Sequence, residues 1–231
     1  MEPIRETRFA LTEMSRFRAD DLTARFTATA NRVALIAPDC MGMTLSYVKE
    51  GHAFTWAASS LDVAALDALQ YLDDGPCLQA MDTGDIVAAA SNDPLDEETW
   101  RLFSRAENSA GVESTLSIPL FADGRVTGGV NFYGRTPAAF DGLHEQLAAE
   151  WGGWAQGAVT NADLSLTGVR RAKETPQKLL DGYVTDQAIG MLMAVHHVPS
   201  EAAAQRLSDA AHRAGIHEVE LARLLVKSRI I

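Results

Sequence analysis

The chain has 231 residues, a formal net charge of −11, 47% hydrophobic residues and 22% charged residues. This composition is typical of a globular protein with one large or two small domains, and it excludes a disordered chain. No apolar run approaches the ~20 residues of a membrane span, and the N-terminus lacks the apolar core of a secretory signal. We therefore expect a cytoplasmic protein that does not contact a membrane.

The sequence lacks the motifs of common metal and nucleotide sites. It contains no paired CxxC motifs, no HExxH, no GxGxxG and no GxxxxGK[ST]. Its two cysteines, Cys40 and Cys77, are predicted to be buried thiols in a reducing compartment. We expect no metal, no cofactor and no catalytic residues.

The acidic charge is unevenly distributed along the chain. Residues 1–163 carry 11 Lys/Arg and 24 Asp/Glu, a balance of −13. Residues 164–231 carry 9 Lys/Arg and 7 Asp/Glu, a balance of +2, together with four histidines. Only the C-terminal part is therefore predicted to approach a polyanion without long-range repulsion.

The first half of the chain alternates between helical and strand periodicity. In order, the pattern predicts helices at 5–18 and 20–37, strands at 43–48 and 53–58, and helices at 61–71 and 77–81. The strand pair is separated by a polar turn that contains Gly51, which indicates a hairpin. Pro76 suits the first turn of the short helix that follows it.

The next elements complete one domain. The pattern predicts a strand at 85–90, a helix at 97–108, strands at 112–121 and 126–133, and a helix at 142–161. Asp123-Gly124 between the last two strands is a strong hairpin signal. A group of strands with helices at both ends and in the crossover predicts an α+β fold with a mostly antiparallel sheet.

No strand pattern follows residue 134, and the C-terminal part is predicted to be a small all-α bundle. Thr175-Pro176 begins a helix at 176–197, and two more helices follow at 200–214 and 217–228. We assign residues 1–163 to the first domain, 164–175 to a basic linker and 176–231 to the three-helix domain. A bundle of this size often needs a partner for stability.

Several motifs in the first domain resemble GAF sensor domains of actinobacterial signalling proteins. They are Leu69-Gln70, Asp74-Gly75-Pro76-Cys77 with Ala80, Trp100, Gly111-Val112-Glu113-Ser114, Ile118-Pro119-Leu120, Gly128-Gly129-Val130-Asn131 and Ala139-Phe140-Asp141. The resemblance covers about residues 20–161. It implies a GAF fold and a possible small-molecule ligand.

The run Ala188-Ile189-Gly190-Met191-Leu192-Met193 resembles the first helix of ANTAR domains, the RNA-binding modules of antitermination regulators. Ala203, Leu207, Ala210-Ala211 and Leu221-Ala222 match small and apolar positions of the next two helices, so the resemblance covers about residues 170–228. It implies a transcription antitermination regulator that binds RNA stem-loops as a homodimer and catalyses no reaction. The candidate RNA-binding residues are Lys178, Ala188, Gly190, Arg206, His212, Arg213, Arg223 and Lys227.

The spacing of small residues around Gly190 also suggests close packing of helix backbones, which would explain a glycine inside a helix.

In the last helix of the first domain, Leu147, Trp151 and Trp154 form a stripe that must be buried. Either the domain's own sheet or a second subunit would cover this stripe. We assign it to the dimer interface.

Two alternative functions remain open at this stage. One is a thiol enzyme similar to the GAF-like reductases of free methionine sulfoxide, with Cys77 at a helix N-terminus as the attacking thiol. The other is a protein-interaction module without RNA affinity. It is motivated by Gly182 and Ile189, which occupy positions where ANTAR domains often carry basic residues.

Overall fold

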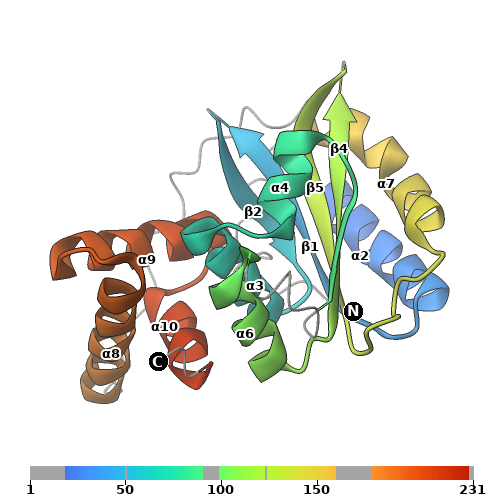
Figure 1. Cartoon of the computed structure of the whole chain (residues 1–231). Coiled ribbons are helices and arrows are strands. Elements are labelled where there is room, and N and C mark those ends of the chain that lie inside the picture. The colour runs from blue at the N-terminus through green and yellow to red at the C-terminus, as the bar shows by residue number, and fades with distance from the viewer. Residues whose placement is uncertain (1–18, 50, 91–98, 123, 160–177, 229–231) are drawn as a thin grey trace.

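The computed structural model describes residues 19–49, 51–90, 99–122, 124–159 and 178–228 (Figure 1). The helices are α2 (Ala19–Ile36), α3 (Leu61–Asp73), α4 (Pro76–Thr83), α6 (Arg101–Ala110), α7 (His144–Val159), α8 (Lys178–His196), α9 (Ser200–Ala214) and α10 (Glu218–Lys227). The strands are β1 (Cys40–Lys49), β2 (His52–Ala58), β3 (Val87–Ala90), β4 (Ser114–Ala122) and β5 (Arg125–Gly134). The helix expected at 5–18 lies outside the described residues.

The strands form one antiparallel sheet in the order β2-β1-β5-β4-β3. Both predicted hairpins are present, since β1 pairs with β2 and β4 pairs with β5. The central pair β1 and β5 joins the two hairpins, and β2 and β3 are the edge strands. The α+β class with an antiparallel sheet is therefore confirmed.

Helices α2 and α7 cover one face of the sheet (Figure 1). Phe26 of α2 and Trp151 of α7 make an edge-to-face contact with ring centroids 6.3 Å apart, and Trp151 also meets Phe132 of β5 at 6.5 Å. Arg32 of α2 and Glu150 of α7 form an exposed ion pair, with Nε and Oε2 2.6 Å apart. This face holds its own hydrophobic cluster, which also includes Leu147 and Cys40.

Helices α3, α4 and α6 lie on the opposite face of the sheet (Figure 1). All residues of α3 from Val63 to Leu72 are buried. The reason is that α3 packs against β1 and β2 and also against α9 and α10 of the C-terminal bundle. It therefore behaves as a central helix without a solvent-facing stripe.

The bundle is formed by α8, α9 and α10, which contact one another pairwise. Leu192, Leu207 and Leu221 are among its fully buried residues. Gly215 ends α9 with a left-handed φ of +68°, in agreement with the predicted helix boundary. The bundle core is continuous with the cluster around α3 and α6, so the two parts share one hydrophobic core.

Candidate functional site

A row of polar residues crosses the sheet on the face that α3 covers. In β1, Thr44 and Ser46 alternate with Met43 and Leu45, which face the opposite cluster. In register with them, Thr55 of β2 lies opposite Ser46, and Asn131 of β5 lies opposite Thr44. Strand alternation thus places a continuous polar row beneath α3.

Asp67 of α3 lies at the centre of this row and is fully buried. Its Oδ1 accepts hydrogen bonds from Thr44 Oγ1 at 2.9 Å, Asn131 Nδ2 at 3.0 Å and Tyr133 OH at 2.6 Å. Its Oδ2 accepts from Thr55 Oγ1 at 2.7 Å and Ser46 Oγ at 3.3 Å. We call Asp67 and these five donors, together with Tyr71, the Asp67 network.

Burial raises the pKa of the Asp67 carboxyl above its ordinary value, although the hydrogen bond from Tyr133 and those from the other donors oppose the rise. Burial, followed by the nearby Asp67, also raises the pKa of Tyr71 and Tyr133 well above the ordinary value. Both phenols therefore stay protonated and available as donors. The Tyr71 hydroxyl lies 3.0 Å from Ser46 Oγ and 2.8 Å from Thr55 Oγ1, which connects it to the network.

The segment from Gln70 to Cys77 is held by the Gln70 side chain. Gln70 Nε2 donates to Tyr133 OH at 3.2 Å, and Gln70 Oε1 accepts from the backbone N–H of Cys77 at 2.7 Å. A Cβ on Gly75 would lie 2.5 Å from Gln70 Cγ, so only glycine fits there without displacing this amide. These contacts explain why Gln70 and Gly75 occur together in this segment, whereas residue 77 contributes only its backbone N–H.

A model of the GAF domain family matches residues 19–153. The chain belongs to the GAF domain family. Helices α2 to α7 and the sheet therefore form a GAF domain, and the Asp67 network lies between its sheet and α3. The match ends before the bundle, so the ANTAR resemblance of the C-terminal residues stays a prediction.

Three solved structures are similar to this chain at low sequence identity. The GAF domain of a two-component sensor histidine kinase from Bacillus halodurans is 9% identical, with a TM-score of 0.42, over 60% of this chain and 96% of that chain. A type II free methionine-R-sulfoxide reductase from Thermoplasma acidophilum is 15% identical, with a TM-score of 0.41, over 68% and 94%. A domain of a putative sensor histidine kinase from Sinorhizobium meliloti is 18% identical, with a TM-score of 0.43, over 58% and 87%. No curated protein matches this chain.

The two thiols lie in different hydrophobic clusters, on opposite faces of the sheet. Cys77 belongs to the cluster around α3, and Cys40 belongs to the cluster around α2 and α7. Burial raises the pKa of the Cys40 thiol to about 11, and it raises the pKa of the Cys77 thiol further. The expectation that both are buried thiols is confirmed. An exchange reaction between them has no support in this geometry.

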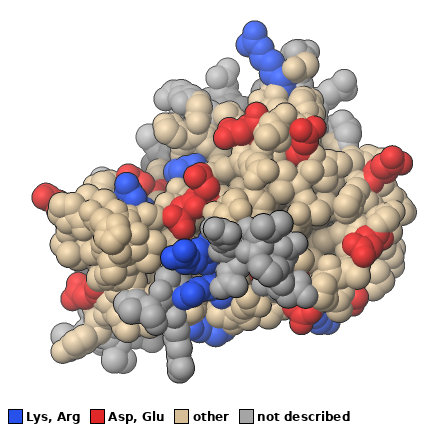
Figure 2. Space-filling view, viewed as in Figure 1, with Lys and Arg blue, Asp and Glu red and all other residues tan. Residues whose placement is uncertain are grey.

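The candidate RNA-binding residues come from all three helices of the bundle, α8, α9 and α10. Arg206, His212, Arg223 and Lys227 are exposed on α9 and α10, and Arg223 Nη1 lies 2.9 Å from Glu220 Oε1. The side chain of Lys178 lies outside the described residues. Figure 2 shows Lys and Arg side chains near the centre of one face, beside the bundle, with acidic side chains scattered around them.

Arg213 differs from the other candidates because it is half-buried between α9 and the GAF domain. Its Nε donates to the carbonyl oxygen of Ala53 in β2 at 2.8 Å, and its Nη1 donates to that of Tyr71 at 3.3 Å. Its guanidinium carbon lies 4.4 Å from the centroid of the Tyr71 ring. Burial lowers the pKa of Arg213, and the nearby Tyr71 opposes this shift, so the side chain remains a cation.

The structure separates the two small residues of the Ala188–Met193 run. Ala188 is fully buried in the bundle core, so it packs against the other helices. Gly190 is exposed, and a Cβ built on it would have no neighbour within 4 Å. The expectation that helix backbones approach each other at Gly190 is therefore wrong, because the residue faces away from α9 and α10.

The stripe assigned to the dimer interface lies largely inside the subunit. Leu147 and Trp151 are both fully buried, in contact with the sheet and α2. They cannot form an interface between subunits, because the domain's own sheet already covers them. The side chain of Trp154 is not among those described.

Sequence reasoning missed the Asp67 network. Strands such as Thr115-Leu116-Ser117-Ile118 alternate polar and apolar residues, which is typical of a sheet with one face in solvent. Here both faces are covered, and the polar face is paired internally. The one available signal was Asp67, an ionisable residue inside the otherwise apolar run from Val63 to Leu69.

Among the described residues, no helix is long and apolar enough to span a bilayer. The same part of the chain contains no cluster of three or more His, Cys, Asp or Glu residues with metal-binding geometry.

Proposed function

We propose that this protein is a signal-responsive regulator of transcription termination. In this proposal the GAF domain senses a small molecule, and the three-helix bundle acts as an ANTAR domain that binds RNA stem-loops as a homodimer. The protein performs no catalysis.

The observation that carries the proposal is the exposed Gly190 within the motif that resembles ANTAR domains. A glycine inside a helix costs ~1 kcal/mol relative to alanine, and no contact within the described residues requires it. Ala188 and Leu192 hold the bundle together, whereas Gly190 leaves helix backbone open to an external partner. A phosphodiester backbone can approach such a surface closely.

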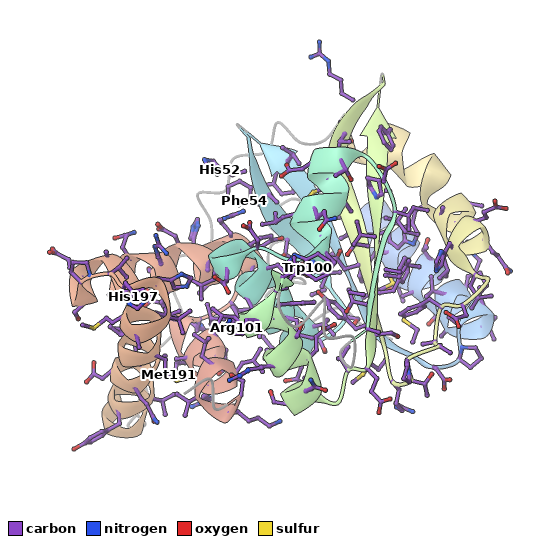
Figure 3. The ribbon with its side chains drawn as sticks, in the orientation of Figure 1. His52, Phe54, Trp100, Arg101, Met191 and His197 are labelled. Atoms are coloured by element: carbon purple, nitrogen blue, oxygen red, sulfur yellow. The ribbon has the colours of Figure 1, made fainter. Side chains whose placement is uncertain are left out.

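The charge distribution also supports RNA binding by the bundle. Exposed Lys227 and Arg223 of α10 lie on the helix that packs against α6, where Arg101 is exposed as well. Figure 3 shows Arg101 at the start of α6, near α10 and the bundle. These cations would bind phosphates, which position an RNA, while sequence would be read from unpaired loop bases.

The test is a salt titration of stem-loop RNA affinity with the full chain. We expect Arg206→Ala and Lys227→Ala each to weaken binding and to reduce the salt slope by about one if each contacts phosphate. Arg125→Ala, at the exposed β4–β5 hairpin of the GAF domain, is the control and should change neither quantity. A full chain that does not bind stem-loops even at low salt would refute the proposal.

A second candidate, a protein-interaction module, is favoured by the exposed face of α8. Tyr183 is 76% exposed and Met193 is 37% exposed, and both lie in a segment, 182–197, without Lys or Arg. Such a face would also fit an apolar surface of a partner protein. If Met193→Glu abolishes self-association while stem-loop affinity is absent in the parent protein, this second function is the correct one.

A thiol enzyme is the least supported alternative. Alkylation of Cys77 in the native chain should be slow at neutral pH, because burial raises the pKa of this thiol. Mass spectrometry after iodoacetamide treatment measures the rate. Alkylation as fast as that of the denatured chain would favour the enzyme.

A further inference from the structure

Within the interface between the bundle and the GAF domain, Arg213 hydrogen-bonds to two GAF elements. Helix α9 packs against α3 and β2, and Arg213 is the α9 residue with hydrogen bonds to both elements in the described structure. One bond goes to Ala53 O in β2 and the other to Tyr71 O near the end of α3, while the guanidinium stacks on the Tyr71 ring. Two carbonyl acceptors and an aromatic face form a site that fits an arginine well.

The same two GAF elements carry the Asp67 network. Thr55 lies two residues after Ala53 in β2, and it donates to Asp67 Oδ2. The Tyr71 ring supports Arg213, while its hydroxyl contacts Ser46 and Thr55. A change in the hydrogen bonds of Asp67 can therefore reach the Arg213 site by two routes, through strand β2 and through the Tyr71 side chain.

A second polar contact joins the domains at the end of α3. His196 Nε2 of α8 lies 3.5 Å from Asp73 Oδ1. The next residue, Asp74, has φ +66° and ψ 168°, a region that is essentially restricted to glycine. The junction that contacts the bundle is thus also a strained part of the GAF backbone.

We propose that Arg213 has two alternative partners: in this docked state it is bound to Ala53 and Tyr71 of the GAF domain, and in the RNA-bound state it is released to contact phosphate. The GAF domain thereby restrains the bundle, and a signal that alters the Asp67 network weakens this restraint. The inference rests on the proposed RNA-binding function. The Nε and Nη1 donors that hold the two GAF carbonyls cannot at the same time donate to phosphate, so docking and RNA binding oppose each other.

The first test measures docking directly, by hydroxyl-radical footprinting of the full chain. Tyr71 is covered by Arg213 in the docked state, whereas Tyr133 is buried under α3 and serves as the internal control. Arg213→Ala should increase oxidation of Tyr71 but not of Tyr133. The matched control is Arg206→Ala, an exposed arginine of the same helix, which should leave both unchanged. Equal Tyr71 oxidation in wild type and Arg213→Ala would overturn the proposal.

The second test adds a stem-loop RNA, first to the wild-type chain, so that its first measurement does not depend on the folding of a variant. RNA binding should raise Tyr71 oxidation, because the bundle leaves its site. Tyr71→Leu, which removes the aromatic support but keeps Arg213, should raise stem-loop affinity by about fivefold or more, the range of ordinary allosteric coupling. Tyr71→Phe, which keeps the ring, controls for loss of the hydroxyl.

The outcomes separate the two proposals. In one outcome, wild type and Tyr71→Leu bind RNA with equal affinity, and binding does not raise Tyr71 oxidation. This outcome overturns the proposal of two alternative Arg213 partners but leaves the proposed function standing. Absence of RNA binding in every chain overturns both. If Tyr71→Leu shows no melting transition, the variant is not folded and its affinity is not used. The proposal is then tested by Tyr71 oxidation of the wild-type chain, measured with and without RNA.

Discussion

At the scale of single residues, Asp67 combines complete burial with five hydrogen-bond donors. Asp67→Ala should leave these donors unpaired and lower the free energy of unfolding by about 3 kcal/mol or more. Asp67→Asn keeps one acceptor oxygen and should cost less. Urea denaturation measures both variants, and Asp62→Asn on the exposed start of α3 is the control. An unchanged midpoint for Asp67→Ala would show that the network does not stabilise the fold.

The raised pKa of Asp67 also has a defined pH dependence. The folded chain holds the proton of Asp67 more tightly than the unfolded chain, whose value is near 3.8. The stabilising contribution is therefore complete below that pH and is lost as the pH rises from there through the folded-state pKa. The stability of wild type relative to Asp67→Asn should fall over this window. A constant difference between the two proteins would contradict the burial argument.

Gly190 and Gly215 respond in opposite ways to the same substitution. Gly190→Ala should raise the free energy of unfolding by about 0.5–1 kcal/mol, because the position is helical and has free space around it. Gly215→Ala should destabilise the chain, because its φ of +68° is unfavourable for alanine. Thermal melting compares the two variants. A lower melting temperature for Gly190→Ala would mean that the glycine has an internal role after all.

At the scale of elements, α7 depends on Trp151 as an anchor to the sheet. Trp151→Ala should cost about 3–5 kcal/mol of stability, because it leaves a cavity between Phe26 and Phe132. Leu35→Ala on α2, at a side chain that is 82% exposed, is the control and should stay within about 0.5 kcal/mol of wild type. Chemical denaturation with parallel light scattering distinguishes loss of folding from loss of association. Dissociation of a dimer without destabilisation would restore the interface interpretation of this stripe.

Most elements could be predicted from periodicity alone. The paired strands of both hairpins, α2, α3 and the three C-terminal helices begin and end within a few residues of their expected positions. Periodicity shows which side of an element is apolar, but it does not show what covers the other side. For α3 the covering partner comes from residues 200–227, more than a hundred positions later in the chain. The polar row under α3 and the docking of Arg213 both depend on that long-range contact, so local patterns did not reveal them.

At the scale of the whole molecule, a shared hydrophobic core ties the GAF domain to the C-terminal bundle. Buried residues of α3 and α6 and those of α9 and α10 belong to one cluster. We therefore expect the full chain to unfold in one calorimetric transition, with equal calorimetric and van't Hoff enthalpies. Arg213→Ala weakens the junction and should broaden this transition. Two well-separated transitions in the wild-type chain would show that the domains unfold independently.

The bond from Arg213 to Ala53 has a further consequence for solubility. Strand β2 is an edge of the sheet, and unpaired groups on an edge strand can pair with strands of other molecules. In the docked state α9 packs against β2, and one of its carbonyls is occupied by the guanidinium. Release of the bundle would uncover this edge, so the released chain should aggregate more readily as its concentration rises. RNA bound to the released bundle would add negative charge, and repulsion between these charges would keep released molecules apart.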